Sequence, residues 1–341
     1  MQKPKVEIVR LEDQWRRTLL ERHWSKECTW VFDKFIAPST LRQYNNYIAQ
    51  FQNFCVSNSL SFPPEQATRS AIIAEFLLFK AKQSERPESM LRSIRAALTH
   101  YFDSIDISEP FCLALRHFST ALVKAETTRP AGRTPIMPIK PFTDMFNNWP
   151  DNDKLTTSKL RLKAVTLLTI STLARCSDLA PTNTLKRDQI HFNTDGSLTL
   201  KMFGIKNDTD RKGFEIRVEK SSIQKCDPVQ TLKDYMTRTA KKVVPKAVFV
   251  KTNSPNDPIS ARGIAEILRA AIKEAGLSDV YTPRCFRPSA ASAAVKAECN
   301  HESIRQLGRW KTREVFYENY VYPLTQTDTT DKILKSELNI Y

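Results

Sequence analysis

Hydrophobic residues recur at helical spacing through the first third of the chain. The pattern predicts Ser39 as the N-cap of a helix. Behind it, apolar side chains share one helical face at Leu41, Tyr44, Ile48, Phe51 and Cys55. Three more segments with this spacing follow Arg69 and begin at Ser89 and Pro110. Residues 35–126 are therefore predicted to form a compact, all-helical domain.

An amphipathic segment precedes this domain, within an N-terminal extension over residues 1–34. Apolar residues in it recur near helical spacing at Trp15, Leu19, Leu20 and Trp24. Such a helix needs a surface that covers its apolar face. It is expected to pack either on the domain that follows or on a partner.

Residues 127–141 contain four prolines and one glycine. They cannot continue a helix, because each proline lacks an N–H group and clashes with the preceding turn. We interpret the segment as an interdomain linker. A long surface loop within one domain is the alternative, although long loops without structure are uncommon.

Beyond the linker, the pattern mixes helices with a few strands. Residues 158–174 are so apolar that they predict a helix buried on most of its circumference. Polar and apolar residues alternate over 197–203 and again over 214–219, which predicts an antiparallel hairpin, and 246–251 predicts a short strand. Further helices are expected behind Asp227 and Pro228, from Ser260 to Gly276, and through the final third. The predicted fold class is mainly α with a small antiparallel β-sheet in the C-terminal domain (142–323), followed by a tail (324–341).

The charge of the chain favours a polyanionic partner. The sequence has 52 Lys and Arg against 37 Asp and Glu, a net charge of +15 over 341 residues. Residues 1–125 carry 17 basic and 13 acidic side chains, which leaves 35 and 24, a surplus of 11, for residues 126–341. The C-terminal part is therefore the better candidate for phosphate binding, and nucleic acid is favoured over membrane.

Several classes of protein are disfavoured by the sequence. The seven cysteines include no CxxC pair, which argues against a zinc finger and a disulfide scaffold. There is no signal-peptide pattern and no apolar run near the ~18 residues that a membrane span needs. The seven glycines form no phosphate-binding loop, and the histidines show no HExxH spacing. We expect no cofactor, no metal site, no membrane and no secretion, with the protein in the nucleus of a eukaryotic host or otherwise in the cytoplasm.

Two cationic residues lie where predicted elements end, one at the end of a helix and one at the tip of a hairpin. In ARCSDL (174–179), Arg175 ends the apolar helix three residues before Asp178. A buried guanidinium must be paired or face a cleft, so this arginine either closes the helix in an ion pair with Asp178 or points into a site. Lys206 lies at the tip of the predicted hairpin, where a solvated turn is the plain alternative.

Two arginines three residues apart, Arg284 and Arg287, precede a helix of small residues in YTPRCFRPSAAS (281–292). This spacing places them on one face, as a clamp for a phosphate or as a solvated helix start. Farther on, LGRW (307–310) brings Trp310, and tyrosines follow it at Tyr317, Tyr320 and Tyr322. An aromatic run of this kind is also typical of a hydrophobic core.

Taken together and in this order, these motifs resemble the catalytic domain of the tyrosine recombinase and phage integrase superfamily. That family has an arginine at a helix end with an acidic residue behind it, a hairpin lysine, an H-x-x-R box, an LGH or LGW box, and a nucleophilic tyrosine about ten residues later. The resemblance also covers the helical domain and the linker, roughly 300 residues. The GRW form of the box and the VFYENYVYP after it look most like Crypton-type recombinases of eukaryotic mobile elements.

The resemblance implies roles for individual residues. Arg175, Arg284 and Arg287 would stabilise charge on the phosphate, with Asp178 supporting, and Lys206 would protonate the leaving 5′ oxygen. Trp310 would pack beside the site and donate its indole N–H to the phosphate. Tyr320 would be the nucleophile, with Tyr317 as the serious rival and Tyr322 as the third candidate.

One position departs from the family pattern. The histidine of the H-x-x-R box is Arg284 here, and arginine cannot accept the proton of the tyrosine. The identity of the general base stays open between water and Asp178.

The implied reaction is cleavage and rejoining of DNA strands through a 3′-phosphotyrosyl intermediate, without ATP or metal. The implied functions are site-specific recombination, integration and transposition, on double-stranded DNA and by a self-associated tetramer, with the tail docking on a neighbour or on its own domain. Two alternatives remain: strand relaxation like that of a type IB topoisomerase, and a domesticated DNA-binding protein that lost catalysis.

Overall fold

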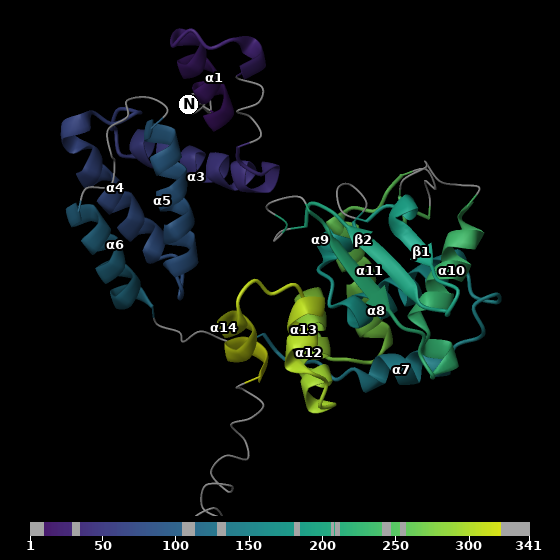
Figure 1. The fold of residues 1–341 in the computed structure, drawn as a ribbon. Coiled ribbons are helices and arrows are strands. Elements are labelled where there is room, and N and C mark those ends of the chain that lie inside the picture. Colours follow the sequence, from purple (N-terminus) through teal and green to yellow (C-terminus); the bar gives the residue numbers. More distant parts are fainter. Residues whose placement is uncertain are drawn as a thin grey trace, which may run out of the picture. The chain divides into compact units, whose positions relative to one another are not determined.

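The computed structural model describes residues 10–28, 35–103, 113–127, 134–180, 185–205, 208, 212–240, 247–252 and 257–321. The chain divides into two compact units, Met1–Gly132 and Arg133–Tyr341, and each is described by itself (Figure 1). The described residues are mainly helical, with one small antiparallel sheet in the second unit. The predicted fold class is therefore confirmed.

Helices packed around aromatic residues form the N-terminal unit. They are α1 (Leu11–Glu21), α3 (Pro38–Ser57), α4 (Gln66–Ala81), α5 (Glu88–Asp103) and α6 (Leu113–Glu126). The ring of Phe51 lies 5.1 Å from that of Phe76 and 6.3 Å from that of Phe102. Ile48, Phe51 and Cys55 are fully buried, so the helical face predicted from their spacing is confirmed.

The start of α3 differs from the prediction. The helix begins at Pro38 with Ala37 as its N-cap, and Ser39 lies inside the first turn. Proline suits the first helical position because its φ is already helical and an N–H there has no partner within the helix. The N-cap predicted at Ser39 is therefore wrong.

Helix α1 packs on the N-terminal unit itself. The backbone N–H of Leu11 donates to Asn45 Oδ1 at 2.9 Å, and the indole N–H of Trp15 donates to the carbonyl of His100 at 3.3 Å. The helix ends at Glu21, and Leu20 and Trp24 are exposed by 45% and 47%. The predicted amphipathic face is thus correct for Trp15 and wrong for Leu20 and Trp24.

The predicted linker lies only partly in the described residues. Residues 134–139 form no regular element, but Met137 is buried and its N–H donates to Ser289 Oγ at 2.7 Å. Helix α7 (Lys140–Asn147) begins before the predicted end of the linker, with Pro141 in its first turn. The end of this segment therefore belongs to the packed C-terminal unit.

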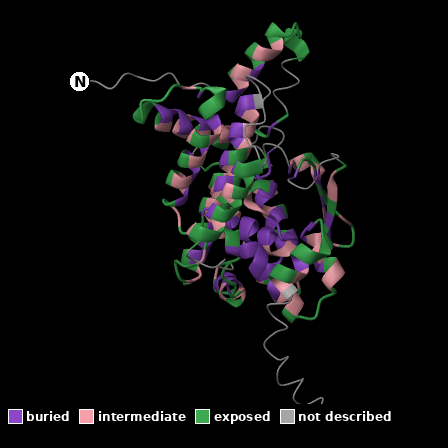
Figure 2. Ribbon diagram, turned by 90° about the vertical axis from the view of Figure 1, so that its left-hand side faces the viewer, coloured by how far each residue is buried: buried purple, intermediate pink, exposed green. Residues whose placement is uncertain are grey.

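A buried helix organises the C-terminal unit. Helix α8 (Thr157–Thr172) is buried over most of its length, as predicted. It packs against strand β3 (Phe214–Val218) and against α10 (Pro228–Arg238), α11 (Ala261–Glu274) and α12 (Phe286–Lys296). Figure 2 shows buried residues concentrated on such inner helices, with exposed ones on the outer faces. Shorter helices of the unit include α9 (Cys176–Leu179), α13 (His301–Leu307) and α14 (Arg313–Phe316), and a π-helical turn, Tyr317–Val321, follows α14.

Two helix starts follow from capping side chains that the sequence predicted. Asp227 accepts the N–H of Val229 at 2.9 Å at the start of α10, and Ser260 Oγ accepts the N–H of Gly263 at 3.2 Å at the start of α11. Gly276 follows α11 with a φ of +70°, a conformation that suits glycine. These three predictions are confirmed.

The sheet has the order β1-β2-β3 and is antiparallel throughout. Strands β2 (Leu198–Met202) and β3 match the predicted hairpin, with Leu198 opposite Val218 and Met202 opposite Phe214. Strand β1 (Ile190–Phe192) was not predicted, because three residues are too few to show a period. The strand predicted over 246–251 is wrong: residues 247–250 are buried but form only isolated bridges, Lys186 to Ala247 and Val250 to Pro258.

We predict that Phe51→Ala lowers the free energy of unfolding of the N-terminal unit by ~3–5 kcal/mol, because it leaves a cavity among buried rings. Urea denaturation measures the change. The matched control is Phe79→Ala, since Phe79 is 49% exposed and should cost far less. Equal losses in the two variants would contradict the proposed core.

Candidate functional site

The turn after α8 places the first predicted arginine. Leu173 has a φ of +50°, and Arg175 then becomes the N-cap of α9. The N–H of Arg175 donates to Asp178 Oδ2 at 2.9 Å, while its guanidinium stays 3.9 Å from the same oxygen. The side chain of Asp178 is only 1% exposed. The structure thus shows a backbone hydrogen bond and a long ion pair between the two residues.

Arg287 ties the turn after α8 to the end of α13. It lies on α12 and is 8% exposed. Its Nη1 donates to the carbonyl of Leu173 at 2.9 Å, and its Nη2 donates to the carbonyl of Gly308. A buried guanidinium is thereby satisfied mainly by backbone carbonyls, which carry no full negative charge.

Trp310 packs between Arg287 and Tyr320. The Arg287 guanidinium lies 4.3 Å from the centre of the indole ring, and the Tyr320 ring lies 4.7 Å from it. Any side chain on Gly308 would collide with this indole, so the glycine of the box permits the packing. The cation–π contact and the ring packing thus bring Arg287 and Tyr320 against the same indole.

The two described tyrosines of this region have different neighbours. Tyr317 lies 5.7 Å from the ring of His301 and 5.5 Å from that of Phe316. Tyr320 contacts Trp310, and it is close enough to Arg287 for its charge to raise the pKa of that guanidinium. Tyr322 lies outside the described residues.

A pocket of about 650 Å³ brings three predicted residues together. Arg175, Arg284 and Arg287 line it, although they are far apart in sequence. A further arginine, Arg269 of α11, lines it as well, and no carboxylate of the described residues does. Sequence reasoning missed Arg269, because only the packing of α11 beside α9 places it there.

A second missed residue lies next to the tryptophan of the box. Arg309 is 3% exposed, and its Nη2 donates to Asp178 Oδ2 at 3.1 Å and to the carbonyl of Leu173 at 3.4 Å. Its φ of +58° is unusual for a residue other than glycine and turns the chain within the LGRW motif. The LGRW motif includes this arginine, but nothing in the motif indicates that its side chain points inward.

The charges of this cluster do not cancel. Burial, together with the neighbouring cations Arg175 and Arg309, lowers the pKa of Arg287 to about 9, although the charges of Tyr320 and Asp178 oppose this. Burial also lowers the pKa of Arg309, although Asp178 opposes this. Three guanidinium groups surround one carboxylate, so an anion that entered the pocket would relieve their repulsion.

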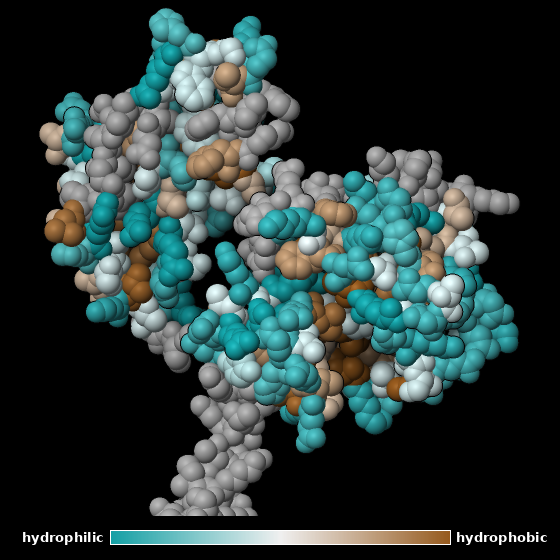
Figure 3. Space-filling view, in the orientation of Figure 1, coloured by the Kyte–Doolittle hydropathy of each residue, from teal (hydrophilic) through white to brown (hydrophobic). Residues whose placement is uncertain are grey.

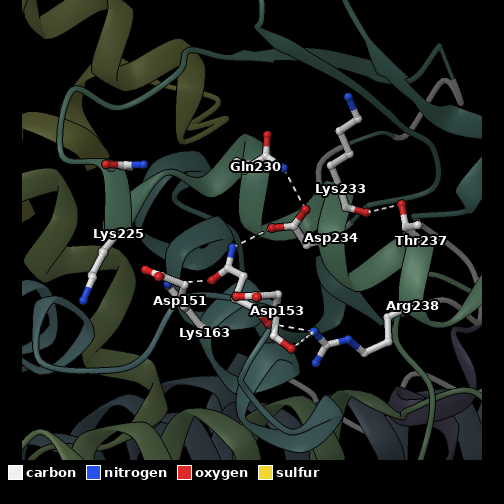
Figure 4. Close-up of a pocket in the computed structure, with 11 residues that line it drawn as sticks. Asp151, Asp153, Lys163, Lys225, Gln230, Lys233, Asp234, Thr237 and Arg238 are labelled. Carbon is white, nitrogen blue, oxygen red and sulfur yellow. Dashed lines mark hydrogen bonds between the residues drawn. The ribbon is translucent and has the colours of Figure 1, made fainter.

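Another pocket of the C-terminal unit, about 570 Å³ in volume, has a different character (Figure 4). Its cations Lys163, Lys225, Lys233 and Arg238 are accompanied by Asp151, Asp153 and Asp234. Arg238 donates to the carbonyl of Asn152 at 2.7 Å, and Lys163 donates to Asn152 Oδ1 at 2.8 Å. Mixed charges and internal bonds make it a poorer anion site than the arginine pocket.

Comparison with protein families agrees with this geometry. Residues 144–326 match the model described as "Phage integrase family", which is more than half of the chain. The chain belongs to the phage integrase family. Membership places it among proteins of DNA recombination and integration. A comparison with curated protein sequences gave no match.

Solved structures of recombinases share the fold at low sequence identity. XerH recombinase bound to its difH substrate is 12% identical with a TM-score of 0.58, over 84% of this chain and 78% of that one. The Tn1549 transposon integrase with circular intermediate DNA is 12% identical with a TM-score of 0.55, over 94% and 99%. A lambda integrase dimer bound to a COC′ core site is 17% identical with a TM-score of 0.54, over 89% and 94%.

The hairpin of this integrase-family domain carries Lys206, which lies outside the described residues. Asp208 nearby is 9% exposed and accepts the N–H of Gly204 at 2.8 Å and that of Gly213 at 3.1 Å. This carboxylate therefore joins the two sides of the hairpin end. Whether Lys206 reaches the arginine pocket stays a prediction.

Hydrophilic residues cover most of the visible face of the C-terminal unit, with apolar ones gathered in a smaller area (Figure 3). In the part of the chain described above, no helix has both the length and the apolar character needed to cross a bilayer.

We predict that inorganic phosphate raises the melting temperature of the wild type, because it binds the folded arginine pocket. Arg269→Ala and Arg284→Ala should each reduce this shift. Differential scanning fluorimetry over a phosphate series measures it. Lys233→Ala in the mixed-charge pocket is the control, and an equal reduction there would contradict the assignment of the anion site.

Proposed function

We propose that the chain is a site-specific DNA recombinase that cleaves and rejoins strands through a 3′-phosphotyrosyl intermediate. The observation that carries the proposal is the arginine pocket, with Tyr320 held beside Arg287 by the ring of Trp310. A phosphodiester needs cations for its non-bridging oxygens and a nucleophile close by. The pocket and the tyrosine offer both.

In the proposed reaction, Arg175, Arg284 and Arg287 contact the scissile phosphate. Arginine suits this role because its planar group donates two parallel hydrogen bonds to phosphate oxygens. The Arg287 guanidinium is already buried and held by the backbone carbonyls of Leu173 and Gly308, so this group needs little reorganisation as the phosphorane forms. Asp178 supports Arg175 through its backbone N–H.

Tyr320 is the proposed nucleophile. Its oxygen forms the new bond to phosphorus, the bond to the 5′ oxygen breaks, and Lys206 donates a proton to that oxygen. Tyr317 is less suitable, because its ring contacts those of His301 and Phe316, whereas the ring of Tyr320 lies on Trp310, which also contacts Arg287. The reverse attack by a 5′-hydroxyl restores the phosphodiester, so the reaction uses neither ATP nor a metal.

Water is the proposed acceptor of the tyrosine proton. Arg284, at the family's histidine position, cannot accept a proton. Asp178 is almost fully buried, and its Oδ2 already accepts bonds from Arg309 and from the Arg175 backbone. This leaves solvent at the open side of the pocket, where Arg284 is exposed.

Double-stranded DNA is the proposed partner, and a tetramer on DNA is the proposed working form. Solved structures of similar fold support this proposal, since lambda integrase is bound to a core site as a dimer and to a Holliday junction as a tetramer. The tail 324–341 lies outside the described residues, so its docking on a neighbouring protomer stays a proposal. Within the family, the GRW box supports a Crypton-type mobile-element recombinase.

We predict that a nicked suicide duplex traps the wild type in a covalent complex and that Tyr320→Phe abolishes it, because phenylalanine has no attacking oxygen. Denaturing gel electrophoresis and mass spectrometry of the linked peptide measure the outcome. Tyr317→Phe is the matched control and should retain the complex. A link to Tyr317 or Tyr322 would overturn the choice of Tyr320.

We further predict that Arg175→Ala lowers the rate of covalent complex formation by ~10²–10³-fold while duplex binding survives, as is typical when one electrostatic donor is lost. Single-turnover kinetics and a binding titration separate the two effects. Arg238→Ala removes an arginine from the mixed-charge pocket and should keep its rate. Full activity of Arg175→Ala would refute its role.

Assays on the same purified proteins distinguish two alternative functions from the proposed one. A supercoil-relaxation assay beside a two-site recombination assay separates a type IB topoisomerase from a recombinase. A wild type that binds DNA but forms no covalent complex with any substrate would indicate a domesticated DNA-binding protein.

A further inference from the structure

Asp178 makes different contacts with two neighbouring arginines, Arg175 and Arg309. Its Oδ2 accepts the Arg309 guanidinium at 3.1 Å, and the bond it accepts from Arg175 comes from the backbone N–H, at 2.9 Å. The guanidinium of Arg175 remains 3.9 Å away, beyond hydrogen-bond distance. The nearly buried carboxylate is thus occupied by one arginine and only approached by the other.

The guanidinium of Arg175 is left available on the pocket side. Its side chain is 30% exposed and lines the arginine pocket. Its Nη1 is shielded from solvent and meets no hydrogen-bond acceptor among the described residues. A cation in this state can bind an incoming phosphate without first breaking an internal hydrogen bond.

The burial and the backbone conformation of Arg309 are both unfavourable for an arginine. Its side chain is 1% exposed, and its backbone has a left-handed φ that disfavours residues other than glycine. It shares the Leu173 carbonyl with Arg287, so it joins the turn after α8 to the LGRW motif. It does not line the arginine pocket, where direct contact with a phosphate would occur.

We propose that Arg309 is a positioning residue, which occupies the Asp178 carboxylate and thereby keeps the Arg175 guanidinium free for the scissile phosphate. This inference rests on the proposed function. It assigns to Arg309 a role that no direct contact with DNA explains.

Loss of Arg309 would change the balance around Asp178. The buried carboxylate would keep its charge and lose the guanidinium that donates to its Oδ2, which is costly for a buried charge. Among the described residues, the Arg175 guanidinium lies 3.9 Å from the same oxygen, and a shift of about 1 Å would bring it into a charge-assisted hydrogen bond. That shift would withdraw Arg175 from the pocket.

A suppression experiment tests the proposal. Arg309→Met should slow covalent complex formation on the suicide duplex by ~10²-fold, as the loss of an electrostatic donor does. Adding Asp178→Asn should restore the rate to within ~10-fold of wild type, because a neutral amide no longer captures Arg175 but still accepts its backbone N–H. In an Arg175→Ala background, Arg309→Met should cause no further loss, since the two act as one unit.

The control is Arg238→Met, which removes a partly buried arginine bonded to the carbonyls of Leu155 and Asn152. It should lower the melting temperature and leave the rate unchanged. A double variant, Arg309→Met with Asp178→Asn, that stays as slow as the single one would overturn the proposal. So would a further multiplicative loss in the Arg175→Ala background.

Phosphate binding separates this inference from the proposed function. A wild type that forms no covalent complex would refute the proposed function, and the same variants would then be titrated with inorganic phosphate by ³¹P NMR. The proposal predicts weaker binding in Arg309→Met and recovery on adding Asp178→Asn. Unchanged binding in Arg309→Met would refute it.

Discussion

The site depends on a surplus of buried positive charge. Among the described residues, Arg175 and Arg309 lie 3.9 Å and 3.1 Å from the Asp178 carboxylate, and the carbonyls of Leu173 and Gly308 accept hydrogen bonds from the nearby Arg287. Carbonyl dipoles satisfy the geometry of guanidinium hydrogen bonds without neutralising the charge. The folded protein therefore holds an unbalanced positive potential at one place, which an anion would stabilise.

Several local features of the backbone and of side-chain packing stabilise this buried positive charge. Leu173 and Arg309 both adopt positive φ, and both contribute a bond to the cluster. Gly308 allows Trp310 to fold back over Arg287, which adds a cation–π contact in place of a counter-ion. Strain and unmet charge are common where a protein sacrifices stability for binding.

The sequence predicted what depends on local pattern. Helical spacing located the helices, since burial of one face imposes it, and alternation located the hairpin. The order of Arg175, Arg284, Arg287 and the tyrosines pointed to a shared site, and the structure places these arginines around one pocket. The stretch 246–251 misled, because its apolar residues are buried by packing and not by strand pairing.

What the sequence could not predict depends on tertiary contacts. Arg269 enters the pocket only because α11 packs beside α9, and Arg309 turns inward only because its backbone adopts a rare conformation. The choice between Tyr317 and Tyr320 likewise needed the position of Trp310. A helical period places a residue on a face but does not say which neighbour covers that face.

The most direct test of the account is a crystal structure of the protein on duplex DNA with vanadate trapped at the cleaved strand. The account predicts a vanadium centre within hydrogen-bond reach of Arg175, Arg284 and Arg287, with the Tyr320 oxygen as one apical ligand. Vanadate held by other residues, with the arginine pocket open to solvent, would contradict it.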